Sequence, residues 1–142
     1  MSAPDITPCP TKELGGKTYR CAFELALACI GGKWKPIILY RLGQEPVMRF
    51  SDLRRSIADV TERMLSRQLR ELEADGLLHR EVFRQVPPKV EYSLTAMGRK
   101  LVPILASLCA WGAEYEQRWS EEHARPAVRT EQGGRTGLAL RP

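Results

Sequence analysis

The chain has 142 residues and a formal net charge of +5, and 43% of its residues are hydrophobic and 27% charged. This length allows one domain with a buried core, and the composition is typical of a folded globular protein rather than a disordered or fibrous one. No stretch approaches the roughly 18 consecutive apolar residues of a membrane span, and the first residues lack a signal peptide's apolar core. We therefore expect a cytoplasmic protein that does not contact membranes.

The positive charge favours a polyanionic partner, but it is unevenly distributed. Four arginines and one glutamate follow Ala124, so +3 of the net charge lies in the last segment of the chain. Because the rest is only mildly basic, a nucleic-acid surface would have to be a local patch.

Motifs that carry chemistry are few. The four cysteines form no C-x-x-C pair and there are only two histidines, so we expect no metal site and no cofactor. No acid–base pair, nucleophile triad or phosphate-binding loop stands out. The sequence therefore predicts a binding protein rather than an enzyme.

Two helices are predicted at the start of the folded part. The apolar run at residues 21–30, with Phe23 and Leu27 at helical spacing, predicts a buried helix that ends at a pair of glycines. Residues 33–42 predict a second helix, in which Pro36 is tolerated because it lies in the first turn.

The next two helices form a helix-turn-helix pattern. Ser51 is the expected N-cap of a short third helix, SDLRRSI, and Thr61 is the expected N-cap of a fourth. The fourth helix sorts its side chains by period: Leu65, Leu69 and Leu72 share one face, and Arg63, Arg67 and Arg70 share the other. One face can pack inward while the other meets phosphate, as in a DNA-reading helix.

Two strands are predicted after Gly76. Residues 77–83 and 89–94 flank a turn that contains two prolines, which rules out one continuous strand. A hairpin directly after the recognition helix is the wing of a winged helix, and Arg84 and Lys89 lie near its tip. The predicted fold class is thus mainly α with a small β-hairpin wing, a winged helix-turn-helix.

A long final helix is predicted from the N-cap Thr95 onward. Apolar residues recur along it at spacings of four and three, at Met97, Leu101, Ile104, Leu108, Trp111 and Tyr115. Such a seam favours a partner helix. Pro103 removes a backbone hydrogen bond, so a bend is expected at residues 101–103.

The predicted organisation has three parts. Residues 1–16 are expected to be a flexible N-terminal arm, residues 17–120 the winged helix-turn-helix domain with its dimerisation helices, and residues 121–142 a disordered basic tail.

The chain also resembles a known family over residues 21–115. The strings IGGKW, RFSDLRR, MLSRQLRELEADGL and VPPKVEYSLTAMGRKL and the final WG, in this order, are similar to the HxlR family of bacterial transcription regulators. The resemblance implies a winged-helix homodimer on a pseudo-palindromic double-stranded DNA operator, joined by its N-terminal and C-terminal helices. The interface residues expected on these helices are Phe23, Leu27, Leu101, Ile104, Leu108, Trp111 and Tyr115.

Candidate DNA-binding residues come from three segments. They are Thr61, Arg63, Ser66, Arg67 and Arg70 of the fourth helix and Arg84 and Lys89 of the wing, with Arg49 and Ser51 near the third helix and Lys33 and Lys35 near the second as weaker candidates. Two alternatives stay open. The arginines can pair with nearby acids on a solvated face, or the winged helix can be a protein-interaction module without specific DNA readout.

The resemblance further implies a sensing role for a cysteine at the start of the first helix, because some members respond to electrophiles, quinones or oxidants. Cys21 occupies that place, although Ala22 follows it where the family usually has proline. A helix N-terminus with Lys17 and Arg20 nearby would stabilise a thiolate; the alternative is a small buried hydrophobe. Cys109 is either seam packing or a resolving thiol for Cys21 across the dimer.

Control by a non-covalent small effector is a further alternative. Trp34, Trp111 and Tyr115 can line an effector pocket or pack in the core or dimer interface.

Overall fold

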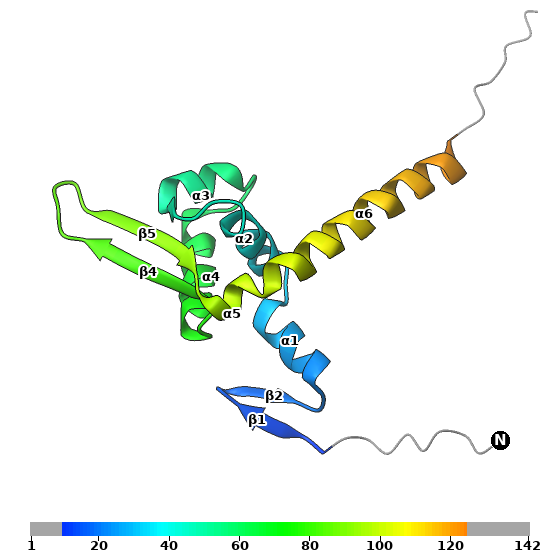
Figure 1. Ribbon diagram of the computed structural model, residues 1–142, viewed down its shortest axis with the longest axis horizontal. Helices are drawn as coiled ribbons and strands as arrows, with labels where there is room; N and C mark the ends of the chain where they lie inside the picture. Colours follow the sequence, from blue (N-terminus) through cyan, green and yellow to red (C-terminus); the bar gives the residue numbers. More distant parts are fainter. Residues whose placement is uncertain (1–9, 125–142) are drawn as a thin grey trace, which may run out of the picture. The chain divides into compact units, whose positions relative to one another are not determined.

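The computed structural model describes residues 10–124, and its secondary structure is mainly helical (Figure 1). The helices are α1 (Ala22–Ile30), α2 (Trp34–Leu42), α3 (Phe50–Ser56), α4 (Glu62–Ala74), α5 (Ala96–Arg99) and α6 (Leu101–His123). The strands are β1 (Lys12–Leu14), β2 (Lys17–Tyr19), β3 (Met48–Arg49), β4 (Leu78–Phe83) and β5 (Lys89–Leu94).

The chain divides into two units within α6. The first ends at Leu108 and holds every other element, and the second begins at Cys109 and holds the rest of α6. No helix of the described residues is long and apolar enough to cross a membrane.

The core of the first unit lies where α2, α3 and α4 meet. Its most deeply buried side chains are Ile38, Leu39, Leu42, Leu53, Leu65, Leu69 and Leu72. Tyr92 and Leu94 of β5 close it on the side of the sheet. The leucine face predicted for the fourth helix is therefore the inner face of α4, and the prediction is confirmed.

The wing is the predicted hairpin with one additional strand. β4 pairs antiparallel with β5 from Leu78↔Leu94 to Phe83↔Lys89, and β3 pairs with the other edge of β5. β3 was not predicted, because a two-residue strand directly before a helix has no measurable alternation. The tip of the hairpin extends away from the helices (Figure 1).

Two threonine caps set the starts of α4 and α5. Thr61 accepts a hydrogen bond from the backbone N–H of Met64 at 3.1 Å, and Thr95 accepts one from that of Gly98 at 3.1 Å, as predicted. The prediction of Ser51 as an N-cap was wrong. The N-cap position is Arg49, two residues earlier, because the chain turns into the helix directly from β3. α3 therefore begins at Phe50, and Ser51 lies inside the first turn.

The final helix is interrupted close to the expected bend. α5 ends at Arg99, Lys100 lies between the helices, and α6 begins at Leu101. Pro103 falls in the first turn of α6, where no intrahelical N–H bond is lost.

Both ends of the chain depart from the prediction. Residues 12–16 were expected in a flexible arm, but β1 and β2 pair across Gly15 and Gly16, whose positive φ values of 56° and 76° suit a two-residue hairpin turn. The tail was expected from residue 121, but α6 continues through His123. The rest of the arm before residue 10 and the tail after residue 124 lie outside the described residues.

The prediction that the first helix is buried was also wrong for the single chain. No residue of α1 is buried, and Phe23 is 72% exposed. The apolar run predicts the helix correctly, but it does not say what covers it.

Candidate nucleic-acid interface

The turn between α3 and α4 is stabilised by apolar side chains that pack into the core and by an ion pair on the surface. Ile57 and Val60 are buried in the core, and Asp59 between them adopts a positive φ of 67°. The guanidinium of Arg54 contacts the carboxylate of Glu62 at 3.1 Å. These contacts fix the direction in which α4 leaves the turn.

The N-terminal half of α4 exposes the predicted polar residues. Arg63 and Arg67 are exposed beside the capped end, whereas Ser66 is only half-buried. The Nε–H of Arg70 points back to the carbonyl oxygen of Ser66 at 3.4 Å. Among residues 10–124, Arg63 takes part in no ion pair, so its guanidinium is free to meet an external acceptor.

Arg67 belongs to an ion-pair cluster that also includes α2. The carboxylate of Glu71 contacts Arg67 Nε at 3.4 Å and Lys35 Nζ at 2.8 Å. The hydrogen bond from Lys35 holds the pKa of Glu71 below its ordinary value, and Arg67 acts in the same direction. Lys35 is largely buried, so it is not available to phosphate as the sequence had suggested.

Of the two cations predicted near the tip of the wing, one is free and one is paired. Arg84 is exposed in the turn after β4, close to the fully exposed Val86. The ammonium of Lys89 contacts Glu91 at 2.8 Å and lies 4.8 Å from the ring centre of Phe83. Arg84 is therefore the stronger candidate for a phosphate contact.

The start of α3 adds exposed groups at its N-terminus. Arg49 and Ser51 are both exposed there, as the sequence predicted. Two arginines of α3, Arg54 and Arg55, were not predicted, and each is paired with an acid, Glu62 or Asp52. Asp52, one turn from Arg55, was a local signal that this charge is partly neutralised, whereas Glu62 lies in the next helix, eight residues from Arg54.

The described cysteines differ in exposure. Cys21 is exposed at the N-cap of α1, Cys29 is half-buried, and Cys109 is exposed in the second unit. The ammonium of Lys17, expected near Cys21, contacts the carboxylate of Asp75 at the end of α4, at 3.1 Å. Within the described residues, no three His, Cys, Asp or Glu side chains are grouped to hold a metal ion.

The aromatic residues of α6 form a ladder on the second unit. Trp111, Tyr115, Trp119 and His123 stack in succession, with ring centres 5.2, 6.2 and 3.8 Å apart. Trp34 instead packs against the core of the first unit. For Trp34, the packing alternative therefore holds, and an effector pocket of Trp34, Trp111 and Tyr115 is not a feature of either unit by itself.

A capped, amphipathic α4, a preceding support helix and a three-stranded wing define a winged helix-turn-helix protein. The HxlR-like helix-turn-helix family model matches residues 29–120, and the chain belongs to this family of transcriptional regulators.

Relatives and solved structures agree with this family. The chain is 45% identical over 115 residues to an HTH-type transcriptional regulator of Methanothermobacter thermautotrophicus, covering 81% of this chain and 87% of the relative. It is 53% identical to the redox regulator HypR in its oxidized form, with a TM-score of 0.62 over 66% of this chain and 96% of HypR. The reduced form of HypR matches with 48% identity and a TM-score of 0.66, over 71% of this chain and 99% of HypR.

Proposed function

We propose that the protein is a homodimeric regulator that binds a pseudo-palindromic DNA operator, with α4 in the major groove. The observation that carries this proposal is the two-faced α4: its leucines are buried in the core while Arg63 and Arg67 stand exposed next to the capped N-terminus. Residues at this end of a recognition helix meet base edges, and arginine can bind a guanine edge with two hydrogen bonds. Arg49, Ser51 and Arg84 supply phosphate contacts on either side.

The first experiment locates the operator and then replaces Arg63, which is proposed to contact a base edge. Footprinting the protein on DNA upstream of its own gene identifies the site. Replacing Arg63 with alanine should cost about 1–3 kcal/mol of operator affinity and relax the preference at one base pair. Arg118→Ala, on α6 in the second unit, is the matched control. Equal operator affinity of Arg63→Ala and wild type would contradict the recognition-helix assignment.

Salt dependence separates this proposal from a protein-interaction module. Each phosphate contact releases counterions and contributes about −0.9 to the slope of log K against log salt concentration. Arg84→Ala should reduce the slope by about one unit and weaken binding equally to all sequences. A protein partner docking on the same face would show no such stepwise slope.

The dimer is proposed to form through α1 and α6. Both helices expose large apolar side chains that a soluble monomer rarely leaves uncovered: Phe23 and Leu27 on α1, and Ile104, Leu108, Trp111, Tyr115 and Trp119 on α6. Leu108→Glu should split the dimer, whereas Ser107→Glu places the same charge on the neighbouring, polar position. A light-scattering mass of Leu108→Glu still near twice 16.1 kDa would argue against this interface.

A redox role for Cys21 is proposed as the input to this regulator. The thiol is exposed at the N-terminus of α1, which excludes the buried-hydrophobe alternative for the single chain, and the relative HypR is a redox regulator. Diamide removes two electrons and two protons from a pair of thiols and leaves a disulfide. It should change the operator affinity of wild type but not of Cys21→Ser, while Cys29→Ser behaves as wild type. Cys109→Ser tests whether Cys109 is the second thiol; an unaltered response of Cys21→Ser would remove Cys21 as the sensor.

A further inference from the structure

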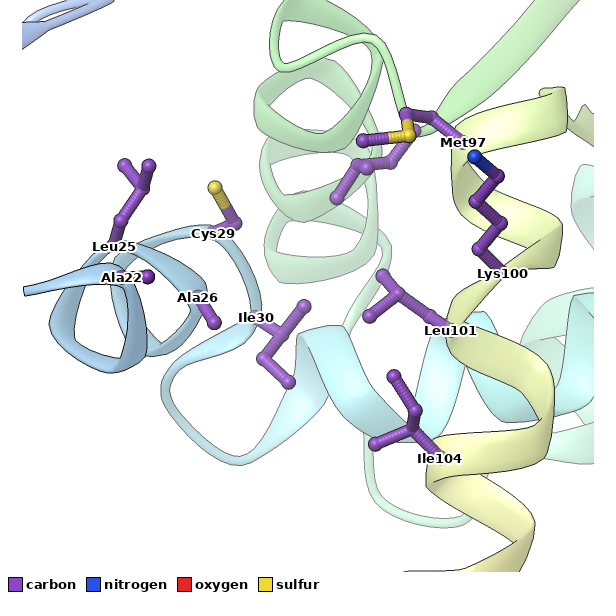
Figure 2. Close-up of a pocket in the computed structure, with 10 residues that line it drawn as sticks. Ala22, Leu25, Ala26, Cys29, Ile30, Met97, Lys100, Leu101 and Ile104 are labelled. Carbon is purple, nitrogen blue, oxygen red and sulfur yellow. The ribbon is translucent and has the colours of Figure 1, made fainter.

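A hollow of about 340 Å³ lies within the first unit, between α1 and the α5–α6 segment (Figure 2). This volume is in the range of small-molecule sites in proteins. Its lining includes none of Trp34, Trp111 and Tyr115, and none of its lining residues is a candidate for DNA contact.

One wall of the hollow is a single face of α1. Ala22, Leu25, Ala26, Cys29 and Ile30 follow one another at spacings of three and four along the helix. Phe23 and Leu27, the residues proposed for the dimer, are not among the lining residues. α1 therefore has two apolar surfaces. On the opposite wall, Ile104 belongs both to the lining and to the dimer surface proposed for α6, so the hollow adjoins that surface.

The opposite wall comes from the residues around the α5–α6 junction. Met97, Leu101 and Ile104 line it, and Figure 2 shows Leu101 and Ile104 pointing across the hollow toward Ile30 of α1. Lys100, between the two helices, is the only charged lining residue. Within the described residues it forms no ion pair, so its ammonium is available to an external anion.

This lining selects a definite class of ligand. Apolar side chains offer no hydrogen bonds to sugars or nucleotides, which would lose their hydration without compensation. The alkyl stem of Lys100 extends the apolar wall while its ammonium stays near solvent. We propose that the hollow binds a small aromatic or aliphatic molecule that carries one anionic group, with its apolar body between α1 and α6 and the anion on Lys100.

The place of the hollow connects it to the proposed regulation, and this step rests on the proposed function. Leu77 lines the hollow and directly follows Gly76, at the end of α4. Its backbone N–H donates to the carbonyl oxygen of Leu72 in α4 at 3.0 Å, and its carbonyl oxygen accepts from Thr95 at 3.1 Å. A ligand against Leu77 thus contacts the junction of α4, the wing and α5, and should alter operator affinity.

The test uses two fluorescent probes that differ by one charge. 1-Anilinonaphthalene-8-sulfonate is an apolar anion, and N-phenyl-1-naphthylamine is its uncharged counterpart. Both should saturate at one molecule per chain of the dimer. Lys100→Met should weaken binding of the anionic probe about three- to fivefold, the range of one partly exposed ion pair, and leave the neutral probe unchanged. Arg99→Met removes a neighbouring cation outside the lining and should change neither.

A second variant tests the volume. Ala26→Phe fills the hollow and should weaken both probes more than tenfold, with near-ultraviolet circular dichroism as the check on folding. If it fails to fold, the charge test on Lys100 still decides. The proposal is overturned if neither probe saturates or if Lys100→Met affects both probes alike. It is also overturned if the probes bind only after Leu108→Glu has split the dimer, because that result would mean that a second copy covers the hollow in the wild-type dimer.

Probe binding and DNA binding are measured separately. Loss of operator binding by wild type with intact probe binding would refute only the proposed function. Intact operator binding that no probe alters would refute the regulatory step, and absent probe binding would refute the site.

Discussion

The carboxylate of Glu71 joins Lys35 of α2 and Arg67 of α4 in one ion-pair cluster, and we expect its charge to stabilise the fold. Glu71→Gln keeps the shape of the side chain but removes the charge that faces Lys35 at 2.8 Å and Arg67 at 3.4 Å. The Lys35 side chain is only 11% exposed, whereas that of Glu71 is 41% exposed. The substitution therefore leaves a largely buried ammonium beside Ile38 and Leu39 without its counter-charge.

The size of the effect follows from this unequal burial. Removing one partner of a fully buried ion pair costs about 3–5 kcal/mol, and breaking an exposed pair costs less than about 1 kcal/mol. With one buried and one partly exposed partner, we expect Glu71→Gln to lower the free energy of unfolding by about 1–2 kcal/mol. For a domain of this size the melting temperature should fall by roughly 4–10 °C.

Urea unfolding followed by circular dichroism measures this loss, and Lys35→Met is the matched control. Lys35→Met removes the buried charge itself and leaves Glu71 in contact with water and Arg67, so it should cost less than Glu71→Gln. Adding Glu71→Gln to Lys35→Met should cost little more. The same Glu71→Gln change releases Arg67, so the salt slope of DNA binding should steepen by up to about 0.9. If the double variant lost as much free energy of unfolding as the two single variants together, the coupling between Lys35 and Glu71 would be refuted.

Three further outcomes are expected. Gly98→Ala should lower the free energy of unfolding by about 1–3 kcal/mol, because its new methyl group overlaps the carbonyl oxygen of Leu77. The methyl group of Gly112→Ala in α6 meets no atom, so this variant should be neutral or slightly stabilising. Thermal melting compares the two variants, and equal losses would contradict the packing at Gly98. Thr61→Ala removes the cap of α4 and should cost about 1 kcal/mol in urea unfolding, more than Thr61→Ser. The pKa of Glu71 is lowered from 4.5 in the fold, so its ion pairs stabilise the protein fully above about pH 4.5 and lose this contribution as the pH falls through the folded-state pKa. Glu71→Gln should lack this pH-dependent loss of stability in acid unfolding. Identical acid-unfolding profiles of the variant and wild type would contradict the role of Glu71.

The winged helix was predictable because its signals are local. The cap at Thr61, the leucine period of α4 and the helix end at Gly76 all act within a few residues. The proline-containing turn after Phe83 likewise marks the wing by short-range sterics.

The errors fall where a local signal has two meanings. Gly15 and Gly16 are found in flexible segments and in tight hairpin turns, and only pairing of β1 with β2 decides between them. Ser51 is a good N-cap residue by type, but the helix follows β3 directly and its N-cap position is Arg49, two residues earlier. The run of apolar residues at α1 predicts a helix, yet its exposure depends on what packs against it.

The sequence by itself determined the order of helices and strands, the inner and outer faces of α4, and the family, because these depend on neighbouring residues and on motifs that follow one another along the chain. Only the tertiary structure decided which basic side chains are held in ion pairs and which are available to an external anion. Lys35 and Glu71 are 36 positions apart, and no sequence periodicity predicts their contact. The hollow beside Lys100 likewise arises only when α1, the end of α4 and the α5–α6 junction come together. Charges and cavities of this kind are properties of distance in space, which the fold sets and the sequence pattern does not display.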